Sequence, residues 1–185
     1  MFLSLLKFFL FFASLVDAAK CGGSSGGRKR LRGRTNCSGG SAGGGSGSGG
    51  SKDISTGVYF IKSAPWNTYL RMHPHGEVDM AENPLPWEKM YVEKQSGNKY
   101  SIKSQEHGNM YVRVDGPGEG RLVNTQTFPG PWEEFYIEFL ANGRVAFRSA
   151  AHNNYLRALP PSQGSNVDTQ TFIGEWEQFT LSQAR

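Results

Sequence analysis

Cysteine is nearly absent from this sequence of 185 residues. Cys21 and Cys37 are the only two, and the stretch from residue 57 to 183 contains none. Any fold formed by that stretch must therefore be stabilised by packing and not by disulfides. In an oxidising compartment the two cysteines could pair with each other or between two molecules, and both alternatives stay open. Neither has a partner at zinc-ligand spacing, so we expect no metal and no other cofactor.

Long apolar runs are missing after the first residues of the chain. Residues 8–16 (FFLFFASLV) follow Lys7 and precede Asp17-Ala18. A charged start, a short apolar run and small residues at a cleavage point are typical of a secretory signal peptide, here residues 1–18. An uncleaved anchor is the alternative, but the run is shorter than the about 20 residues of a comfortable membrane span. We therefore predict a secreted, extracellular protein with no stable membrane span, and we do not expect nucleic acid as a partner.

Catalytic motifs are a third absence. The sequence has no nucleophile elbow and no glycine-rich phosphate loop before a helix. Carboxylates are numerous enough for a glycosidase pair, but Glu88, Glu133 and Glu177 recur at regular intervals. That recurrence favours a structural role, because an active site is normally built once. His73 and His75 have no evident third metal ligand. We expect a protein that is not an enzyme.

Glycine and serine dominate the segment after the apolar run, which has too little apolar surface to offset the entropy of ordering. We therefore predict a signal peptide at 1–18, a disordered basic linker at 19–56 and one folded domain at 57–185. Charge is divided similarly, because residues 19–52 carry seven Lys/Arg and no acid, whereas residues 53–185 carry 12 Lys/Arg and 15 Asp/Glu. Such asymmetry is typical of a tail that binds a partner.

A cluster of basic residues lies within this linker. It is interpreted as a site that attracts polyanions such as acidic glycans, and a protease-processing site and a solvated linker are the alternatives. Asn36-Cys37-Ser38 is formally an N-glycosylation acceptor, and glycosylation of Asn36 would compete with disulfide formation at Cys37. The residues predicted to bind polyanions are Arg28, Lys29, Arg30, Arg32 and Arg34.

Three internal repeats fill the rest of the chain. Each unit opens with a short apolar stretch, continues through a polar turn into Tyr-x-Arg, and later has a tryptophan followed by glutamate. These tryptophans, Trp87, Trp132 and Trp176, are 45 and 44 residues apart. Apolar and polar residues alternate with period two between glycine, proline and asparagine, which is typical of strands and turns. Residues 57–183 have no helical periodicity of useful length.

A single unit cannot bury its own apolar face, so the three units must share one core. A solenoid needs a longer array and a propeller at least four blades, which leaves three-fold closure. We predict an all-β domain, a β-trefoil of three repeats of about 44 residues. The indole N–H groups of the repeated tryptophans should donate to backbone. Equivalent residues expected in the core are Ile61, Ile102 and Phe147; Leu70, Val112 and Leu156; Val78, Val123 and Val167; and Met90, Phe135 and Phe179.

The repeats resemble the fascin family of β-trefoils over residues 57–183. Unit one departs from the pattern, because Trp66 replaces the turn histidine and Met90 replaces phenylalanine. No Gln-x-Trp triplet is present, so the chain does not resemble ricin-type lectins. The motifs that carry the resemblance are Ile102-Lys103-Ser104, His107-Gly108-Asn109 and Tyr111-Val112, their recurrence as Phe147-Arg148-Ser149, His152-Asn153-Asn154 and Tyr155-Leu156, and the Trp-Glu-x-Phe endings at Trp132 and Trp176.

The resemblance implies binding of actin filaments. Family members that bundle filaments have several trefoils, whereas this chain has one, and a signal peptide would remove the protein from cytoplasmic actin. Fascin-like single trefoils attached to secreted enzymes look like accessory sugar-binding modules. We therefore expect extracellular glycans or polyanions as partners, with actin filaments as the alternative.

Two near-duplicate segments are the predicted ligand sites. Residues 123–128 (VNTQTF) and 167–172 (VDTQTF) place amide or carboxylate groups beside a ring. Sugars suit this pairing, because a ring stacks on C–H faces while polar groups take the hydroxyls. Residues 78–83 of unit one lack the ring, so at most two sites are expected, and the alternative is that both rings fill the barrel mouth. The predicted ligand-binding residues are Asn124, Gln126, Phe128, Asp168, Gln170 and Phe172.

Overall fold

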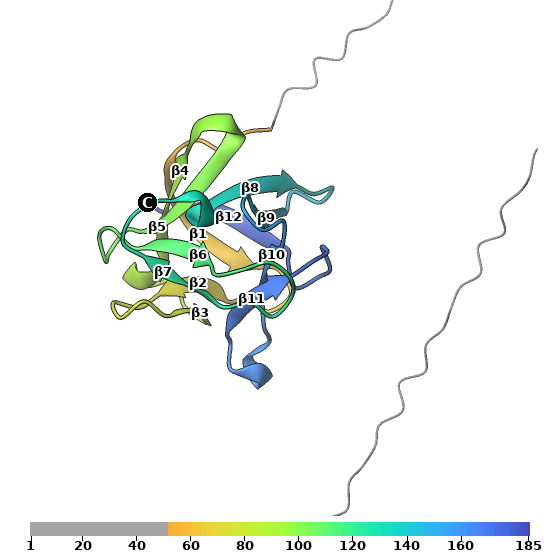
Figure 1. Cartoon of the computed structure of the whole chain (residues 1–185). Helices are drawn as coiled ribbons and strands as arrows, with labels where there is room; N and C mark the ends of the chain where they lie inside the picture. Colours follow the sequence, from red (N-terminus) through yellow and green to blue (C-terminus); the bar gives the residue numbers. More distant parts are fainter. Residues whose placement is uncertain (1–51) are drawn as a thin grey trace, which may run out of the picture. The chain divides into compact units, whose positions relative to one another are not determined.

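A computed structural model describes residues 52–185 as a 12-stranded antiparallel sheet with short 3₁₀ turns (Figure 1). The strands are β1 (Gly57–Ser63), β2 (Tyr69–Met72), β3 (Val78–Ala81), β4 (Lys89–Lys94), β5 (Lys99–Ser104), β6 (Tyr111–Val114), β7 (Val123–Gln126), β8 (Glu134–Phe139), β9 (Val145–Ser149), β10 (Tyr155–Ala158), β11 (Val167–Gln170) and β12 (Phe179–Gln183). The 3₁₀ helices are η1 (Pro86–Glu88), η2 (Ser96–Asn98), η3 (Pro131–Glu133) and η4 (Pro161–Gln163). The predicted signal peptide, the polyanion-binding cluster, Asn36 and both cysteines lie outside the described residues.

Six strands close into a barrel. Each pairs with two neighbours, in the order β1, β4, β5, β8, β9, β12 and back to β1. Pairings between successive units are the longest, because β4 with β5, β8 with β9 and β12 with β1 each align five residue pairs. Within a unit, pairing falls from four residue pairs between β1 and β4 to one between β9 and β12. The barrel is therefore held together chiefly by contacts between units.

The other six strands form three hairpins, β2–β3, β6–β7 and β10–β11. Their second strands contact one another. Backbone bonds tie one hairpin to the next: the Met80 N–H donates to Ser165 O at 2.8 Å, and the Thr125 N–H to Gly76 O at 3.1 Å. Six barrel strands and three connected hairpins form the predicted β-trefoil.

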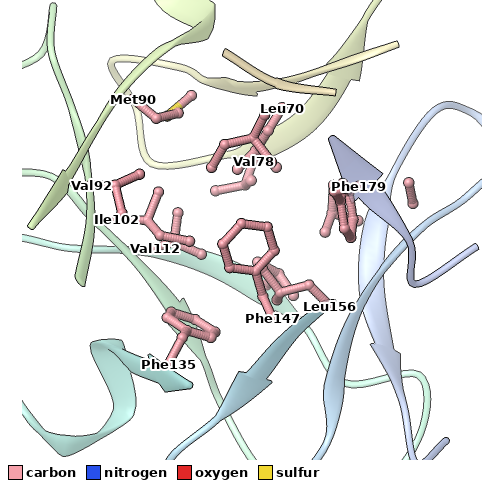
Figure 2. Packing of buried hydrophobic residues seen from close by; sticks show 14 of the residues in the cluster. Leu70, Val78, Met90, Val92, Ile102, Val112, Phe135, Phe147, Leu156 and Phe179 are labelled. Carbon is pink, nitrogen blue, oxygen red and sulfur yellow. The ribbon is translucent and has the colours of Figure 1, made fainter. Parts of the chain in front are cut away.

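Equivalent apolar residues of the three units meet in one core (Figure 2). Each residue of the four predicted triplets is at most 4% exposed. The rings of Phe147 and Phe179 meet edge-on with centroids 5.6 Å apart. Full burial of one large apolar side chain contributes about 1.5–3 kcal/mol. A core of this size explains how the domain is stable without a disulfide.

An aromatic pair lies at each junction between units. The repeated tryptophan of one unit packs edge-on against the turn residue of the next. The pairs, with their centroid distances, are Trp87 and His107 (5.1 Å), Trp132 and His152 (5.2 Å), and Trp176 and Trp66 (5.5 Å). The last pair joins unit three to unit one, so Trp66 keeps the contact that histidine makes elsewhere.

The predicted backbone acceptors of the repeated indoles are not found. Within residues 52–185 the indole that donates to the backbone is that of Trp66, to Ala158 O at 2.9 Å. Trp87 and Trp132 are 38% and 44% exposed, so water can accept from their indole N–H groups. The prediction was therefore wrong for the repeated tryptophans.

The turn that carries His107, His152 or Trp66 has a left-handed residue at its next position. Asn67, Gly108 and Asn153 have φ values of 62°, 71° and 61°. Glycine adopts this conformation at little cost, and asparagine tolerates it better than most residues do. The His-Gly and His-Asn pairs of the repeats therefore reflect backbone geometry.

A buried glutamate stabilises the loop before the last strand of each unit. Glu88, Glu133 and Glu177 are 2–3% exposed. Each carboxylate accepts from the backbone N–H three residues earlier. The donors are Leu85 at 2.9 Å, Gly130 at 2.7 Å and Gly174 at 2.6 Å. The contacts match the structural role that the recurrence of the glutamates predicts.

The domain begins before Gly57. Asp53 accepts hydrogen bonds from the Lys94 ammonium and the Tyr100 hydroxyl. The Ile54 side chain packs against the core, and its N–H donates to the Tyr100 hydroxyl oxygen at 3.2 Å. Residues 53 and 54, which the sequence analysis places in the linker, therefore belong to the domain.

Replacing Glu133 with alanine should lower the free energy of unfolding by about 1–3 kcal/mol, because the Gly130 N–H loses its acceptor. Urea unfolding followed by tryptophan fluorescence measures the change. Glu133→Gln keeps an acceptor oxygen and should cost less. Equal losses for the two variants would contradict the capping role.

Candidate functional site

The two predicted rings project into solvent. Phe128 and Phe172 are each 61% exposed, in the loops after β7 and β11. They do not fill the barrel mouth, so that alternative is wrong. Unit one has Asn83, which is also exposed, at the equivalent position four residues before its tryptophan.

A hollow of about 340 Å³ lies beside Phe172. It combines two rings with amide, guanidinium and carboxylate groups. A Cβ atom at Gly174 would lie 3.0 Å from a carboxylate oxygen of Glu177, so the close approach of this backbone to Glu177 favours glycine. The lining residues are Arg157, Gln170, Phe172, Gly174, Glu175, Trp176 and Glu177.

A hollow of about 330 Å³ occupies the equivalent place in unit one. Arg71 and Glu88 line it as Arg157 and Glu177 line the hollow of unit three. Asn83 and Leu85 replace the phenylalanine and the glycine, so this hollow has no aromatic ring. The two hollows share a scaffold and differ in the groups that face a ligand.

In each unit an arginine pairs across the hairpin with an aspartate or asparagine, beside the loop that carries Asn83, Phe128 or Phe172. In unit three Arg157 donates from Nε and Nη2 to Asp168 at 2.7 and 2.6 Å. In unit one Arg71 donates to Asp79 at 2.8 and 2.5 Å. In unit two Arg113 makes a single bond of 2.9 Å to the amide oxygen of Asn124, which carries no counter-charge. Asp168 and Asn124 are therefore engaged within the protein.

The carboxyl group of Asp79 responds to two opposing effects. Burial by itself raises its pKa, but the hydrogen bonds from Arg71 and the nearby His73 ring outweigh burial and leave the pKa below its ordinary value. The pair with Arg71 is therefore an ion pair at neutral pH. Bidentate arginine–carboxylate geometry fixes both side chains.

Each of the two predicted glutamines is bonded to the threonine that follows it, and Gln170 also accepts from the Thr171 hydroxyl at 3.4 Å. The side-chain oxygen of Gln126 accepts from the Thr127 N–H at 3.0 Å, and that of Gln170 from the Thr171 N–H at 2.8 Å. Gln170 is 7% exposed and lines the hollow of unit three. These bonds orient the two side-chain amides and occupy their oxygens as acceptors, which leaves the amide N–H groups as donors.

A third hollow, of about 740 Å³, lies where the three hairpins meet. Its lining includes Val78, Val123 and Val167, together with Asn124 and Asp168. The predicted residues are therefore divided. Asn124 and Asp168 line this axial hollow, whereas Gln170 and Phe172 line the hollow of unit three.

Sequence reasoning missed Arg157, Trp176 and Glu175 as members of the site. The Tyr-x-Arg triplet could have identified Arg157. If the two strands form a hairpin, Arg157 on β10 lies opposite Asp168 on β11. Glu175 carries no repeat signal, since prolines stand at its equivalent positions, 86 and 131.

No protein-family model matches the chain, and no curated protein matches it. Among solved structures the chain is similar to a designed 3-fold symmetric protein, ThreeFoil, with a TM-score of 0.62 and 13% sequence identity. The match covers 69% of this chain and 99% of that one. At this identity the similarity supports the three-fold β-trefoil and says nothing about a ligand.

The described residues contain no group of three His, Cys, Asp or Glu side chains placed to hold a metal ion. His73 Nε2 lies 3.2 Å from an oxygen of Asp79, and His75 Nε2 lies 3.1 Å from Glu77. Within residues 52–185 there is also no helix with the length and apolarity to cross a bilayer.

Glu177 should make stability depend on pH. Burial raises the pKa of its carboxyl above the ordinary value of 4.5, and the hydrogen bond from the Gly174 N–H offsets this only in part. A raised pKa means that the contribution to stability is present below that ordinary value and is lost as pH rises through the folded pKa. Relative to Glu177→Gln, the wild type should therefore lose stability as pH rises from below the ordinary value of 4.5 through the raised folded pKa. Chemical unfolding of both proteins measures this difference, and a constant difference would contradict the assignment.

Proposed function

We propose that this protein is a secreted, non-enzymatic binding module that recognises glycans through the ring-bearing loops of its β-trefoil. The observation that carries the proposal is the exposed Phe172 ring beside a hollow lined by Trp176 and by polar groups. A phenylalanine that is 61% exposed contributes little to the core, so its presence there favours a surface role.

The chemistry of the hollow suits a sugar. A ring offers an apolar face to the C–H groups of a pyranose, while a few polar groups fix the orientation of its hydroxyls. Gln170 supplies an amide whose oxygen is already engaged, which leaves its N–H groups as donors. Unit two offers a second candidate place, where the exposed Phe128 stands in the same loop as Trp132, which is 44% exposed.

The fascin-like family is part of the proposal, with actin filaments as the alternative partner. The residues that carry the resemblance are chiefly structural, because His107 and His152 pack against Trp87 and Trp132 at the unit junctions. They support descent from a fascin-like trefoil and leave its ligand open. Co-sedimentation with F-actin tests this alternative.

The basic cluster would add affinity for polyanions. Replacing its five Lys/Arg with serine in the full chain should weaken binding to sulfated glycans and leave binding to uncharged glycans unchanged. The loss should also disappear at high salt, because salt screens such contacts. Loss of all glycan binding in this variant would instead place recognition in the tail.

Phe172→Ala should weaken glycan binding about threefold to tenfold, because one stacking contact is lost. Its free energy of unfolding should stay within about 0.5 kcal/mol of the wild type, since the ring is exposed. Phe128→Ala should behave in the same way, and Asn83→Ala in unit one is the matched control with no expected loss. A glycan array followed by titration calorimetry measures the affinities. No glycan signal for the wild type, together with co-sedimentation with F-actin, would sink the proposal.

A further inference from the structure

The hollow of unit three has an uneven charge. Arg157 is the basic residue in its lining, and both of its donating directions toward Asp168 are occupied, at 2.7 and 2.6 Å. The charge of the guanidinium is therefore neutralised within the protein. Glu175 and Glu177 remain, so the space beside Phe172 has a negative balance.

Glu177 is the less compensated of two equivalent glutamates. In unit one Arg71 Nε lies 3.9 Å from Glu88. Within residues 52–185 no basic group lies within ion-pair distance of Glu177, whose carboxylate accepts from the Gly174 N–H at 2.6 Å. Burial raises the pKa of this carboxyl. A cation placed in the hollow would offset the free-energy cost of burying this negative charge.

The rings act in the same direction as the carboxylates. The face of an aromatic ring carries a negative potential that attracts cations, and tryptophan does so most strongly. Phe172 and Trp176 line the hollow together with both glutamates. Rings and carboxylates around one space form a suitable environment for an ammonium group, and they disfavour sulfate and uronate groups.

Unit two differs in this respect. Asn124 stands where unit three has Asp168. Arg113 therefore makes a single bond of 2.9 Å to a neutral amide, and this bond does not balance its positive charge. Proline replaces Glu175 at residue 131. The loop that carries Phe128 therefore lacks the negative balance of the loop that carries Phe172.

From these observations we infer that the hollow of unit three selects glycans with free amino groups over acetylated and acidic glycans. The inference rests on the proposed glycan-binding function and names the ligand class of one site. The sugar ring lies against Phe172, and its ammonium group lies toward Glu175 and Glu177. The formal net charge of the full chain is +4, so unspecific attraction would favour acidic glycans instead.

Titration calorimetry of the full chain tests this selectivity with three probes: a glucosamine tetrasaccharide, its fully N-acetylated form, and a tetragalacturonate. The titrations are run at about pH 7, because burial raises the pKa of Glu177 above its ordinary value and amines, which titrate at higher pH, still carry charge there. We expect the amine form to bind about fivefold or more tightly than the acetylated form, and the preference to shrink with added salt.

Three variants locate the selectivity. Glu175→Gln should reduce the preference about twofold to fivefold and leave the affinity for the acetylated form unchanged. Phe172→Ala should abolish the preference, whereas Phe128→Ala should leave it. Glu106→Gln removes an exposed carboxylate outside the hollow and is the charge control.

The outcomes distinguish a failure of the proposed amine selectivity from a failure of the proposed glycan binding. Equal affinity for the amine and acetylated forms, or a preference that survives Glu175→Gln and Phe172→Ala, would overturn the selectivity while glycan binding stands. Absence of binding to all three probes and across a glycan array would overturn both. Tightest binding of the tetragalacturonate would also overturn the selectivity and would assign recognition to the basic tail.

Discussion

The pairing of the first barrel strand with the last one is the interaction on which the rest of the structure depends. Five residue pairs, from Tyr59 with Gln183 to Ser63 with Phe179, join β1 to β12. Within unit three, β12 is otherwise aligned with β9 through a single pair, Phe179 with Val145. The edge-on contact of Trp66 with Trp176 reinforces the same junction. Because no unit can bury its own apolar face, the core forms only when the two ends of the domain meet.

Closure with three-fold symmetry presents the same scaffold three times. In each unit the loop after the hairpin lies between an arginine paired across the two strands and a buried glutamate that accepts from a backbone N–H. These shared features maintain the fold. The differences, such as phenylalanine or asparagine at the loop and aspartate or asparagine opposite the arginine, change the groups that each unit presents at its surface. Function in such a domain lies in the positions where the units diverge, since the scaffold alone does not define a ligand.

The fold and core were predictable because they repeat. Period-two alternation and three equivalent positions identify Ile61, Ile102 and Phe147 as core residues, and all three are at most 1% exposed. The site was predictable only in part, because a side chain near a ring in sequence can face elsewhere. Asp168 points to Arg157 across the hairpin, which depends on strand register. No local pattern indicates that Asp53 binds Lys94 and Tyr100, because those contacts span 41 and 47 residues of chain.

A nuclear magnetic resonance titration of the isotope-labelled full chain with a glucosamine tetrasaccharide would test the proposed binding site most directly. Backbone amide shifts should concentrate in residues 170–177, where Phe172 and Trp176 line the hollow. The equivalent loop of unit one, residues 81–88, should show much smaller shifts, because its hollow contains no ring. Shifts concentrated at the axial hollow around Val78, Val123 and Val167, or the absence of shifts in the domain, would contradict this assignment.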